Sequence, residues 1–409
     1  MGLDITIDKI PFSTFQVLHK RKNNRELVLF GAGPISQKTA RKLNDQHDFI
    51  VDNNPNMWGE IEKSKNIFNP TALENRANEC FIVICTTSFM EVSKQLINLG
   101  YVPEKDFIIS PILNDLRVIS ELEYHKATML FTSGLPEVDD PESGGGVYEL
   151  ILDGHNHSYK KIYSGICYGL IEYKDTYITV DDKKGVIQFD KDYNIILSKP
   201  LNNATRGHGI DYCSINKQFY VVSSYRDSVI VLDNKFNQID EITISNKFTQ
   251  YGVPEHHCND LCVVGHSLYI SMFSHTGNYK KDVFDGVVLE IDLTTNTILS
   301  PVMTDLWMPH NISFLDGSLT VLDSLRGELK TNNARAVGRF PAFTRGLDFD
   351  GVYYYIGQSR NRNYSKNLGL SLNISIDTAI VIFDQVTKAS RTIQLPQKLS
   401  EIHSILVLK

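Results

Sequence analysis

The sequence lacks the features that would place the protein in a membrane or outside the cell. It has no apolar run of about 18 residues, which excludes a transmembrane helix of ordinary length. Its first segment, MGLDITIDKIPFSTFQ, has neither the continuous apolar core nor the cleavage site of a signal peptide. Its 6 cysteines form no CxxC pair, which argues against a zinc ribbon or a disulfide framework. We therefore expect a cytoplasmic protein with reduced thiols.

An excess of positive charge is also absent. The 41 Lys and Arg residues are outnumbered by 48 Asp and Glu, and the net charge of -7 excludes a general attraction to nucleic acid. Hydrophobic residues make up 42% and charged residues 22%, which is typical of a soluble globular protein and not of a disordered chain or a coiled coil. At about 150 residues per domain, the length predicts two or three domains.

The first part of the chain alternates short apolar strands with segments of helical spacing. Strands are predicted at 26–30, 49–51, 81–85 and 107–109, and helices at 35–43, 89–99 and 113–122. This alternation is typical of a parallel sheet with helices on both faces. We predict a small Rossmann-like α/β domain over residues 1–124.

The remainder consists of short β-rich runs separated by Gly, Asn and Asp turns. Six segments pass from a polar or ring residue into an apolar strand, at Tyr168, His208, Cys258, His310, Arg345 and His403. A period of roughly 40–50 residues with up to four strands per unit is typical of a β-propeller. The last unit offers only a strand at 403–408, and its missing strands lie at 127–132, 147–152 and 159–163. We predict an all-β, six-bladed β-propeller over residues 125–409, closed by the C-terminal strand; the alternative is a pair of β-sandwiches.

A glycine-rich turn follows the first predicted strand and opens a helix, and Asp52 ends the next strand. This arrangement matches a dinucleotide fingerprint, in which a helix N-terminus faces a phosphate. Ser36 stands where the third glycine is expected, and the domain offers about one mononucleotide-binding half. Three interpretations follow: a scaffold without a tightly bound cofactor, a site for a nucleotide or nucleotide-sugar, or an NAD(P) site. The predicted contact residues are Gly31, Gly33, Pro34, Ile35, Ser36, Asp52 and Asn53.

Histidines gather at the starts of the predicted inner strands of the propeller. Five of the 12 histidines lie in or beside the six segments. Because inner strands line the central channel, these side chains should converge. Imidazoles in a channel can bind a divalent transition metal such as zinc, manganese or iron, act as acid or base, or only bond to backbone and water. The predicted metal ligands are His208, His257, His310 and His403.

Arginines form a second predicted group at the same mouth of the channel. They lie in the turns between second and third strands, or beside the starts of the inner strands. Guanidinium forks suit phosphate or carboxylate, whereas the alternative is a set of solvated turn charges. The predicted anion-binding rim is Arg206, Arg226 and Arg326, and the predicted catalytic residues are Tyr168, Arg345, Arg360 and His403.

Two resemblances extend these interpretations. The series GAGPIS, IVDNNP, Trp58-Gly59, Asn69-Pro70 and FIVICTTS, within residues 25–112, resembles the Rossmann-like domain attached to bacterial sugar-modifying enzymes of surface-polysaccharide clusters. That resemblance implies that the glycine turn and the Asp-Asn-Asn-Pro stretch face a nucleotide-sugar or a related ligand.

The second resemblance covers residues 200–408. The series Met308-Pro309-His310, LTVLDS, Phe343-Thr344-Arg345-Gly346-Leu347, IGQSR and Glu401-Ile402 resembles a bacterial family of conserved β-propeller proteins of unknown function. It implies the fold and no reaction. Oligogalacturonate lyases and carotenoid oxygenases hold catalytic metals in propeller histidines, which is an analogy of architecture only.

Together these features predict a metal-dependent enzyme that acts on an anionic or nucleotide-linked sugar in bacterial surface-polysaccharide metabolism. Lyase, epimerase and hydrolase chemistry all fit. The alternatives are a non-catalytic glycan- or protein-binding propeller with a regulatory Rossmann-like domain, and an NAD-dependent oxidoreductase with the propeller as scaffold. The expected partner is a small molecule, without nucleic acid or a membrane span, and the oligomeric state is left open.

Overall fold

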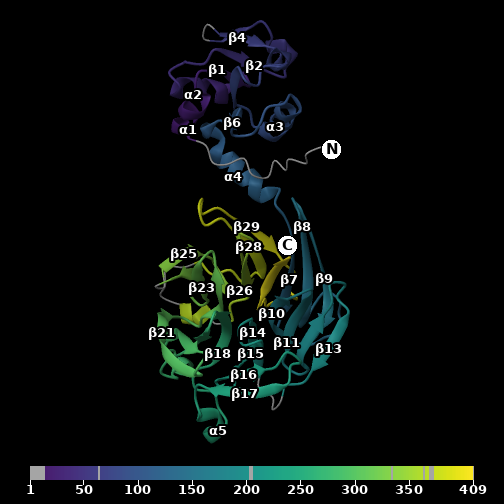
Figure 1. Cartoon of the computed structure of the whole chain (residues 1–409), viewed down its shortest axis with the longest axis vertical. Coiled ribbons are helices and arrows are strands. Elements are labelled where there is room, and N and C mark those ends of the chain that lie inside the picture. The colour runs from purple at the N-terminus through teal and green to yellow at the C-terminus, as the bar shows by residue number, and fades with distance from the viewer. Residues whose placement is uncertain are drawn as a thin grey trace. The chain divides into compact units, whose positions relative to one another are not determined.

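The computed structural model divides into two compact units, residues 1–123 and 124–409 (Figure 1). It describes residues 14–62, 65–201, 206–332, 335–362, 364–367 and 373–408. Within these ranges, no helix is long and apolar enough to cross a membrane. The predicted fold class is confirmed: a Rossmann-like parallel sheet is followed by a six-bladed β-propeller.

The first unit contains a six-stranded sheet in the order β3-β4-β2-β1-β5-β6, parallel except for the β3–β4 pair. Its strands are β1 (Glu26–Phe30), β2 (Phe49–Val51), β3 (Ile61–Glu62), β4 (Lys65–Phe68), β5 (Cys80–Ile84) and β6 (Phe107–Ile109). Its helices are α1 (Phe15–Lys22), α2 (Pro34–Lys42), α3 (Phe89–Asn98) and α4 (Asn114–Glu123), with short 3-10 turns η2 (Pro55–Met57), η3 (Pro70–Leu73) and η4 (Pro111–Leu113). The β3–β4 hairpin and α1 were not predicted, because their sequences are short or polar.

The central strand β1 explains why helices cover both faces of this sheet. Val28 packs with Val92 of α3 in one core, whereas Leu27 packs with Ala40 of α2 in the other. Side chains alternate between the faces of a strand, so a continuously apolar strand needs cover on both sides. The order of the strands reverses at β1, which places Gly31 at the switch point where such sheets bind ligands.

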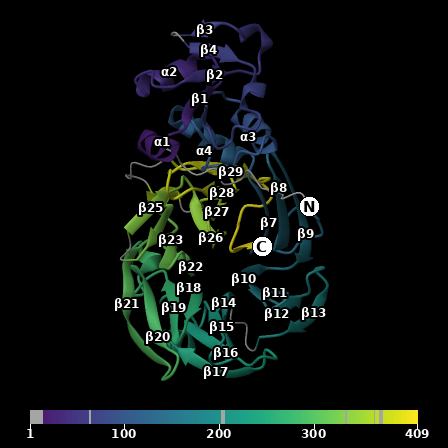
Figure 2. The same cartoon turned by 45° about the horizontal axis from the view of Figure 1, so that its top comes forward.

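The second unit is a ring of six four-stranded antiparallel sheets (Figures 1 and 2). Blade 1 is β30 (Ile405–Leu408), β7 (Lys126–Ser133), β8 (Gly146–Asp153) and β9 (Asn156–Ser164). Blade 2 is β10 (Cys167–Tyr173), β11 (Thr176–Asp181), β12 (Gly185–Phe189) and β13 (Ile195–Lys199). Blade 3 is β14 (Gly207–Cys213), β15 (Gln218–Ser223), β16 (Ser228–Leu232) and β17 (Gln238–Thr243), followed by α5 (Lys247–Tyr251).

The other three blades continue the same order of strands. Blade 4 is β18 (Cys258–Val264), β19 (Ser267–Met272), β20 (Gly286–Asp292) and β21 (Thr297–Leu306), with η5 (Tyr279–Lys281) in a loop. Blade 5 is β22 (His310–Leu315), β23 (Ser318–Asp323), β24 (Glu328–Thr331) and β25 (Arg335–Arg339). Blade 6 is β26 (Phe343–Phe349), β27 (Tyr354–Ser359), β28 (Ala379–Phe383) and β29 (Ser390–Gln394), with η6 (Tyr364–Asn367) between β27 and β28.

The C-terminal strand closes the ring, as predicted. Ile405 of β30 pairs with Phe131 of β7, in antiparallel register. Thr132 extends this pairing: its carbonyl accepts from the His403 amide at 2.9 Å, and its hydroxyl accepts from the Ser404 amide at 3.0 Å. The first blade is thus built from both ends of the propeller.

Carboxylates join neighbouring inner strands. Each accepts a backbone N–H of the next blade: Asp211 from Val263 at 2.7 Å, Asp260 from Asn311 at 2.8 Å, and Asp348 from Val407 at 2.6 Å. Burial raises the pKa of Asp211 and of Asp260 to about 6, because removal from water penalises the charged carboxylate.

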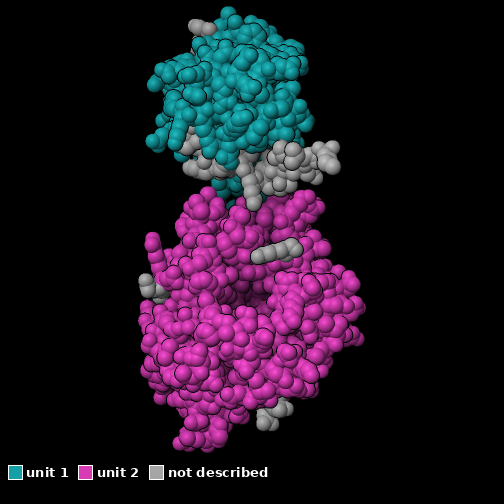
Figure 3. Space-filling model, in the orientation of Figure 1, with its two compact units in different colours: residues 1–123 teal, residues 124–409 magenta. Residues whose placement is uncertain are grey.

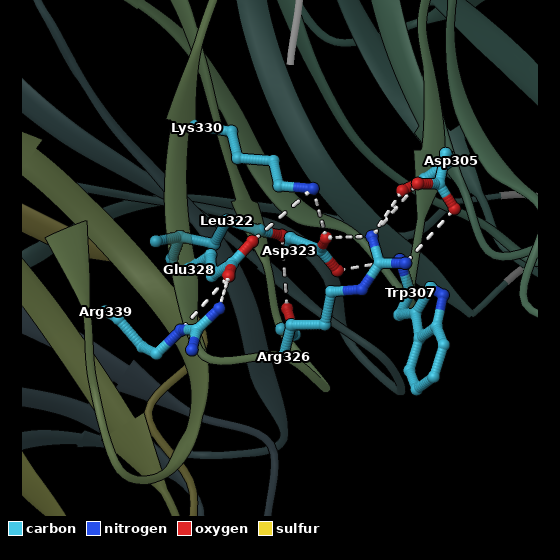
Figure 4. Close-up of polar contacts among 9 residues, drawn as sticks. Asp305, Trp307, Leu322, Asp323, Arg326, Glu328, Lys330 and Arg339 are labelled. Carbon is cyan, nitrogen blue, oxygen red and sulfur yellow. Dashed lines mark hydrogen bonds and ion pairs between the residues drawn. The ribbon is translucent and has the colours of Figure 1, made fainter. Parts of the chain in front are cut away.

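A buried ionic network ties blade 5 together (Figure 4). The carboxylate of Asp323 is fully buried and lies 2.7 Å from the Lys330 ammonium and 3.1 Å from the Arg326 guanidinium. It also accepts from the Trp307 amide at 2.7 Å. A buried carboxylate is tolerated only when it is paired in this way.

We predict that Lys330→Met destabilises the propeller by about 3 kcal/mol, because it leaves buried carboxylates short of a partner. Urea denaturation followed by circular dichroism measures the change. The matched control is Lys126→Met. Lys126 forms an ion pair with Asp153, and the two side chains are 74% and 65% exposed. This substitution should change stability by less than about 0.5 kcal/mol, and equal effects of the two substitutions would contradict the prediction.

Candidate functional site

A cavity of about 510 Å³ lies in the propeller channel, and Figure 3 shows a hollow at the centre of this unit. Its wall is formed where the inner strands begin and by the segments beside them. From these starts come Tyr168, Arg206, His208, His257, Asn259, His310, Arg345, Glu401 and His403. Phe343, the first residue of β26, also belongs to this group. From the neighbouring loops come Gly134, Leu135, Pro136, Phe273, Tyr279, Lys280, Met308, Arg362 and Lys366.

The structure brings the four predicted histidines to one cavity together with Tyr168. The Tyr168 ring stacks on His208, with centroids 4.1 Å apart, and meets His403 edge-on at 4.7 Å. The ring of His208 lies 6.0 Å from that of His403 and 6.3 Å from that of His257. The convergence of the inner strands thus creates one cluster of rings.

Burial keeps these histidines uncharged at neutral pH. It lowers the pKa of His257 to about 3, with further lowering by Arg206, and the pKa of His403 to about 4, with further lowering by Arg345. The pKa values of His208 and His310 are lowered well below the ordinary range, again mainly by burial. Neutral imidazoles can accept a proton from a ligand. Burial has the opposite effect on Tyr168, whose phenol pKa it raises.

Glu401 is a buried carboxylate that three positively charged or ring groups share. It lies 3.1 Å from Nε2 of His403 and 3.4 Å from Nη1 of Arg345, and Arg362 forms a further ion pair with it. Burial opposes ionisation of Glu401, but His403 and Arg345 outweigh it, so the pKa of this carboxylate is strongly lowered. An ionised Glu401 accepts from Nε2 of His403 and leaves Nδ1 as the nitrogen that can exchange a proton.

Several buried polar atoms of the cavity wall lack partners. Among the described residues, Nε of Arg345, Nε2 of His208 and Oδ1 of Asn259 have no hydrogen-bond partner. Nη1 of Arg345 forms the ion pair with Glu401 but no hydrogen bond. A buried donor without an acceptor costs free energy, and a charged donor costs most. An anionic ligand would provide the missing acceptors.

The backbone is strained at three points of the same wall. Arg206, His257 and Met308 have φ angles of 46°, 55° and 55°. Residues with a Cβ rarely adopt this left-handed region, and such strain concentrates at binding sites. Gly134 is a different case, since an added Cβ would lie 2.5 Å from Cε1 of Tyr168 and 2.8 Å from Nε2 of His403. Only glycine lets these two rings lie so close to the chain.

Three predicted arginines lie outside the cavity wall that the described residues form. Arg226 donates to Glu241 at 2.8 Å, and Arg326 belongs to the network of blade 5, paired with Asp305 and Asp323. Arg360 is exposed. The structure therefore does not bring Arg226, Arg326 and Arg360 together with Arg206 and Arg345.

Sequence reasoning assigned no role to several residues of the wall. Glu401, Asn259, Lys280, Arg362 and Lys366 line the cavity but were not predicted as site residues. Glu401 offered a signal, because it stands two residues before His403. Lys280 and Lys366 lie in loops without periodicity, where the sequence does not indicate which way a side chain points.

The histidines do not form a metal-ligand set in this arrangement. In the described part of the chain, no group of three or more His, Cys, Asp or Glu side chains could hold a metal ion. Nδ1 of His310 contacts the Met308 carbonyl at 2.9 Å and the Ser324 hydroxyl at 2.8 Å, which leaves Nε2 as its available nitrogen. The nearby guanidiniums of Arg206 and Arg345 also disfavour a cation. The predicted metal site does not fit these donors.

The glycine turn of the first unit is held by Asp52. Its carboxylate accepts from the Ala32 amide and the Asn54 amide, each at 2.7 Å. Gly33 caps α2, whose first residue is Pro34 and therefore lacks an N–H. The carboxylate thus braces the turn, and its oxygens are already used where a dinucleotide site would bind ribose.

A separate cavity of about 440 Å³ lies in the first unit. Its wall includes Asn53, Trp58, Asn69, Thr71 and Lys94. Of the seven residues predicted to contact a nucleotide, Asn53 alone lines it. Gly31, Gly33, Pro34, Ile35, Ser36 and Asp52 form the turn and helix start described above.

The fold and channel define the second unit as a six-bladed β-propeller with a polar, cationic cavity. The chain belongs to the family described as "Domain of unknown function (DUF4915)", whose model matches residues 167–409. This supports the resemblance of the C-terminal part to propellers of unknown function. The match does not include the first unit, so the resemblance of residues 25–112 stays a prediction.

Solved structures with similar folds have low identity. They include a protein of unknown function from Bacteroides caccae (13% identity, TM-score 0.48, 69% of this chain and 99% of that chain). They also include virginiamycin B lyase from Staphylococcus aureus (11%, 0.41, 58% and 73%) and the calcium-binding protein regucalcin from Agrobacterium tumefaciens (11%, 0.40, 57% and 75%). These likenesses carry no argument about function. No curated protein matches the sequence.

We predict that the histidines of the cavity make the propeller less stable as the pH falls from about 6.5 toward 5. The pKa of His403 is about 4 in the folded chain and near 6.5 in the unfolded chain, so the unfolded chain binds more protons in this window. The stability that His403 contributes is therefore complete above about pH 6.5 and falls by about 1.4 kcal/mol per pH unit below it. Asp211 and Asp260, with pKa values of about 6, act in the opposite direction.

The test compares the protein with its His403→Gln variant. Asp211 and Asp260 are present in both proteins, so their contribution cancels in the difference between the two free energies of unfolding. Urea unfolding at about pH 7, 6 and 5 should give a shallower pH dependence for the variant. Parallel curves for the two proteins would contradict the prediction.

Proposed function

We propose that the propeller channel is the active site of an enzyme that acts on an anionic sugar of the uronic acid class. The observation that carries this proposal is Arg345, whose guanidinium is buried with Nε unpartnered beside a cavity of about 510 Å³. Arg206, Arg362 and Lys280 add positive charge to the same wall. A carboxylate is the ligand that such a guanidinium binds best.

The wall also supports removal of a proton next to that carboxylate. A neutral histidine, His208 or His403, takes the proton from the adjacent carbon. The electron pair moves into the carboxylate as an enediolate, and Arg345 binds its oxygens. Return of the proton to the other face of the same carbon gives an epimer. Loss of the oxygen at the β carbon gives an unsaturated product instead, and Tyr168 protonates that leaving oxygen. The raised pKa of Tyr168 keeps its hydroxyl protonated at neutral pH.

Lyase or epimerase chemistry fits the wall better than hydrolysis. Most glycoside hydrolases need a pair of carboxylates. Glu401 is the single carboxylate among the described residues of the wall, and it is engaged by His403, Arg345 and Arg362. A binding module without catalysis is the alternative, and it would retain the ligand unchanged.

For the first unit we propose a scaffold role rather than an NAD(P) site. The carboxylate of Asp52, which a dinucleotide site would use for ribose, is engaged by the Ala32 and Asn54 amides. Of the residues predicted to contact a nucleotide, Asn53 lines the cavity of this unit and stays a candidate for contact with a nucleotide-sugar.

We predict that Arg345→Gln weakens binding of glucuronate by about 50-fold, because a charge-assisted hydrogen bond contributes about 1.5–3 kcal/mol. Isothermal titration calorimetry measures the affinity, and NMR of incubated galacturonate and glucuronate oligomers detects an epimer or an unsaturated product. The matched control is Arg226→Gln, which should bind as the parent does. Equal affinity in the Arg345 variant would overturn the proposal.

We predict that the purified protein contains no stoichiometric transition metal and binds glucuronate equally well after treatment with EDTA. The basis is the donor geometry of His208, His257, His310 and His403. Elemental analysis of the parent and of His310→Ala measures this. One metal equivalent in the parent that is lost in the variant would restore the metal-dependent route.

A further inference from the structure

A second cavity of about 430 Å³ adjoins the channel. It lies between the β11–β12 turn of blade 2 and the β15–β16 turn of blade 3. Its wall is made of Asp181, Asp182, Lys183, Gly185, Leu201, Arg206, Gly207 and Tyr225. Arg206 also lines the channel cavity, so its side chain forms the wall between the two.

Arg206 is held between two aromatic rings. Its guanidinium carbon lies 6.0 Å from the ring centre of Tyr168 on the channel side and 5.3 Å from that of Tyr225 on the other. Its Nη1 donates to the Tyr225 hydroxyl at 3.3 Å. A ligand that enters both cavities must therefore pass over this guanidinium, and the group that passes gains most if it is anionic.

The second cavity has the chemistry of a nucleoside site. Tyr225 lines this cavity and is 39% exposed, and its ring centre lies 6.5 Å from that of Phe248 of α5. The accessible part of the ring, beside the Arg206 guanidinium, can stack on a base. Asp182 is half-buried and offers a carboxylate to hydroxyl groups. Asp181 is engaged by the Tyr163 hydroxyl at 3.0 Å and the Lys183 amide at 2.8 Å.

We propose that the propeller binds its anionic sugar linked to a nucleoside diphosphate. The sugar carboxylate contacts Arg345 in the channel, the diphosphate lies over Arg206, and the nucleoside stacks on Tyr225 with its ribose hydroxyls toward Asp182. This inference rests on the proposed function, and it assigns the nucleotide to the propeller and not to the glycine turn of the first unit.

The test compares ligands that differ only in the linked group. Binding of free glucuronic acid, UDP-glucuronic acid, GDP-mannuronic acid and digalacturonic acid is measured by calorimetry with the full chain. We expect both nucleotide-linked uronates to bind at least about tenfold tighter than free glucuronic acid. Tyr225→Ala should remove about tenfold of that gain and leave the affinity for free glucuronic acid unchanged.

The matched control is Tyr251→Ala. Tyr251 lies on α5, the helix that carries Phe248, is 72% exposed and does not line either cavity. This variant should retain the full gain, and thermal unfolding confirms that both variants fold. A gain that survives Tyr225→Ala would overturn the inference, because the nucleotide would then lie elsewhere. The inference would also be overturned if digalacturonic acid were the one ligand whose affinity gain depends on Tyr225, because the second cavity would then bind a glycan. Absence of any Arg345-dependent uronate binding would instead overturn the proposed function.

Discussion

The pairing of β30 with β7 is the constraint on which the cavity depends. Glu401 and His403 stand just before β30, and Gly134 follows β7, so the register of this pair sets where all three lie. Thr132 binds the backbone of His403 and Ser404 on one side and the Tyr168 carbonyl on the other. A slip of one residue would turn every side chain of β30 to the opposite face and disperse the site.

The contrast between two buried charge clusters indicates where the molecule expects a ligand. In blade 5, Asp323 is surrounded by Lys330, Arg326 and the Trp307 amide, and its charge is balanced within the fold. In the channel, the carboxylate that forms an ion pair with Arg345 is Glu401, which Arg345 shares with Arg362. The same physical rule, that buried charge requires partners, is satisfied in one place and left open in the other. We therefore regard the channel as the functional part of the propeller.

The positions of the inner strands could be predicted from the sequence, because each blade repeats the step from a polar residue into an apolar strand. The same repeat predicted that Tyr168, Arg345 and the four histidines converge. The outer strands of blade 5 were less clear, since ELKT and RAVGR are short and polar. Arg206 lines the cavity as expected, whereas the places of Arg226, Arg326 and Arg360 could not be predicted. The direction of a turn side chain depends on carboxylates distant in sequence, such as Glu241 for Arg226. The fit of the four histidines to a metal could not be judged from the sequence for a similar reason, because ring orientation is set by contacts such as that of His310 with Ser324.

The closure of the ring by β30 also has a consequence for synthesis of the chain. Blades 2 to 6 consist of consecutive strands and can form as they leave the ribosome. Blade 1 stays incomplete until residues 405–408 emerge, because the edge of β7 that pairs with β30 has no partner before then. During this interval Tyr168 and Gly134 face an incomplete wall, since Glu401 and His403 have not yet arrived. A partly translated chain therefore exposes an open sheet edge and no assembled cavity, so the cavity is complete only in chains whose translation has passed β30.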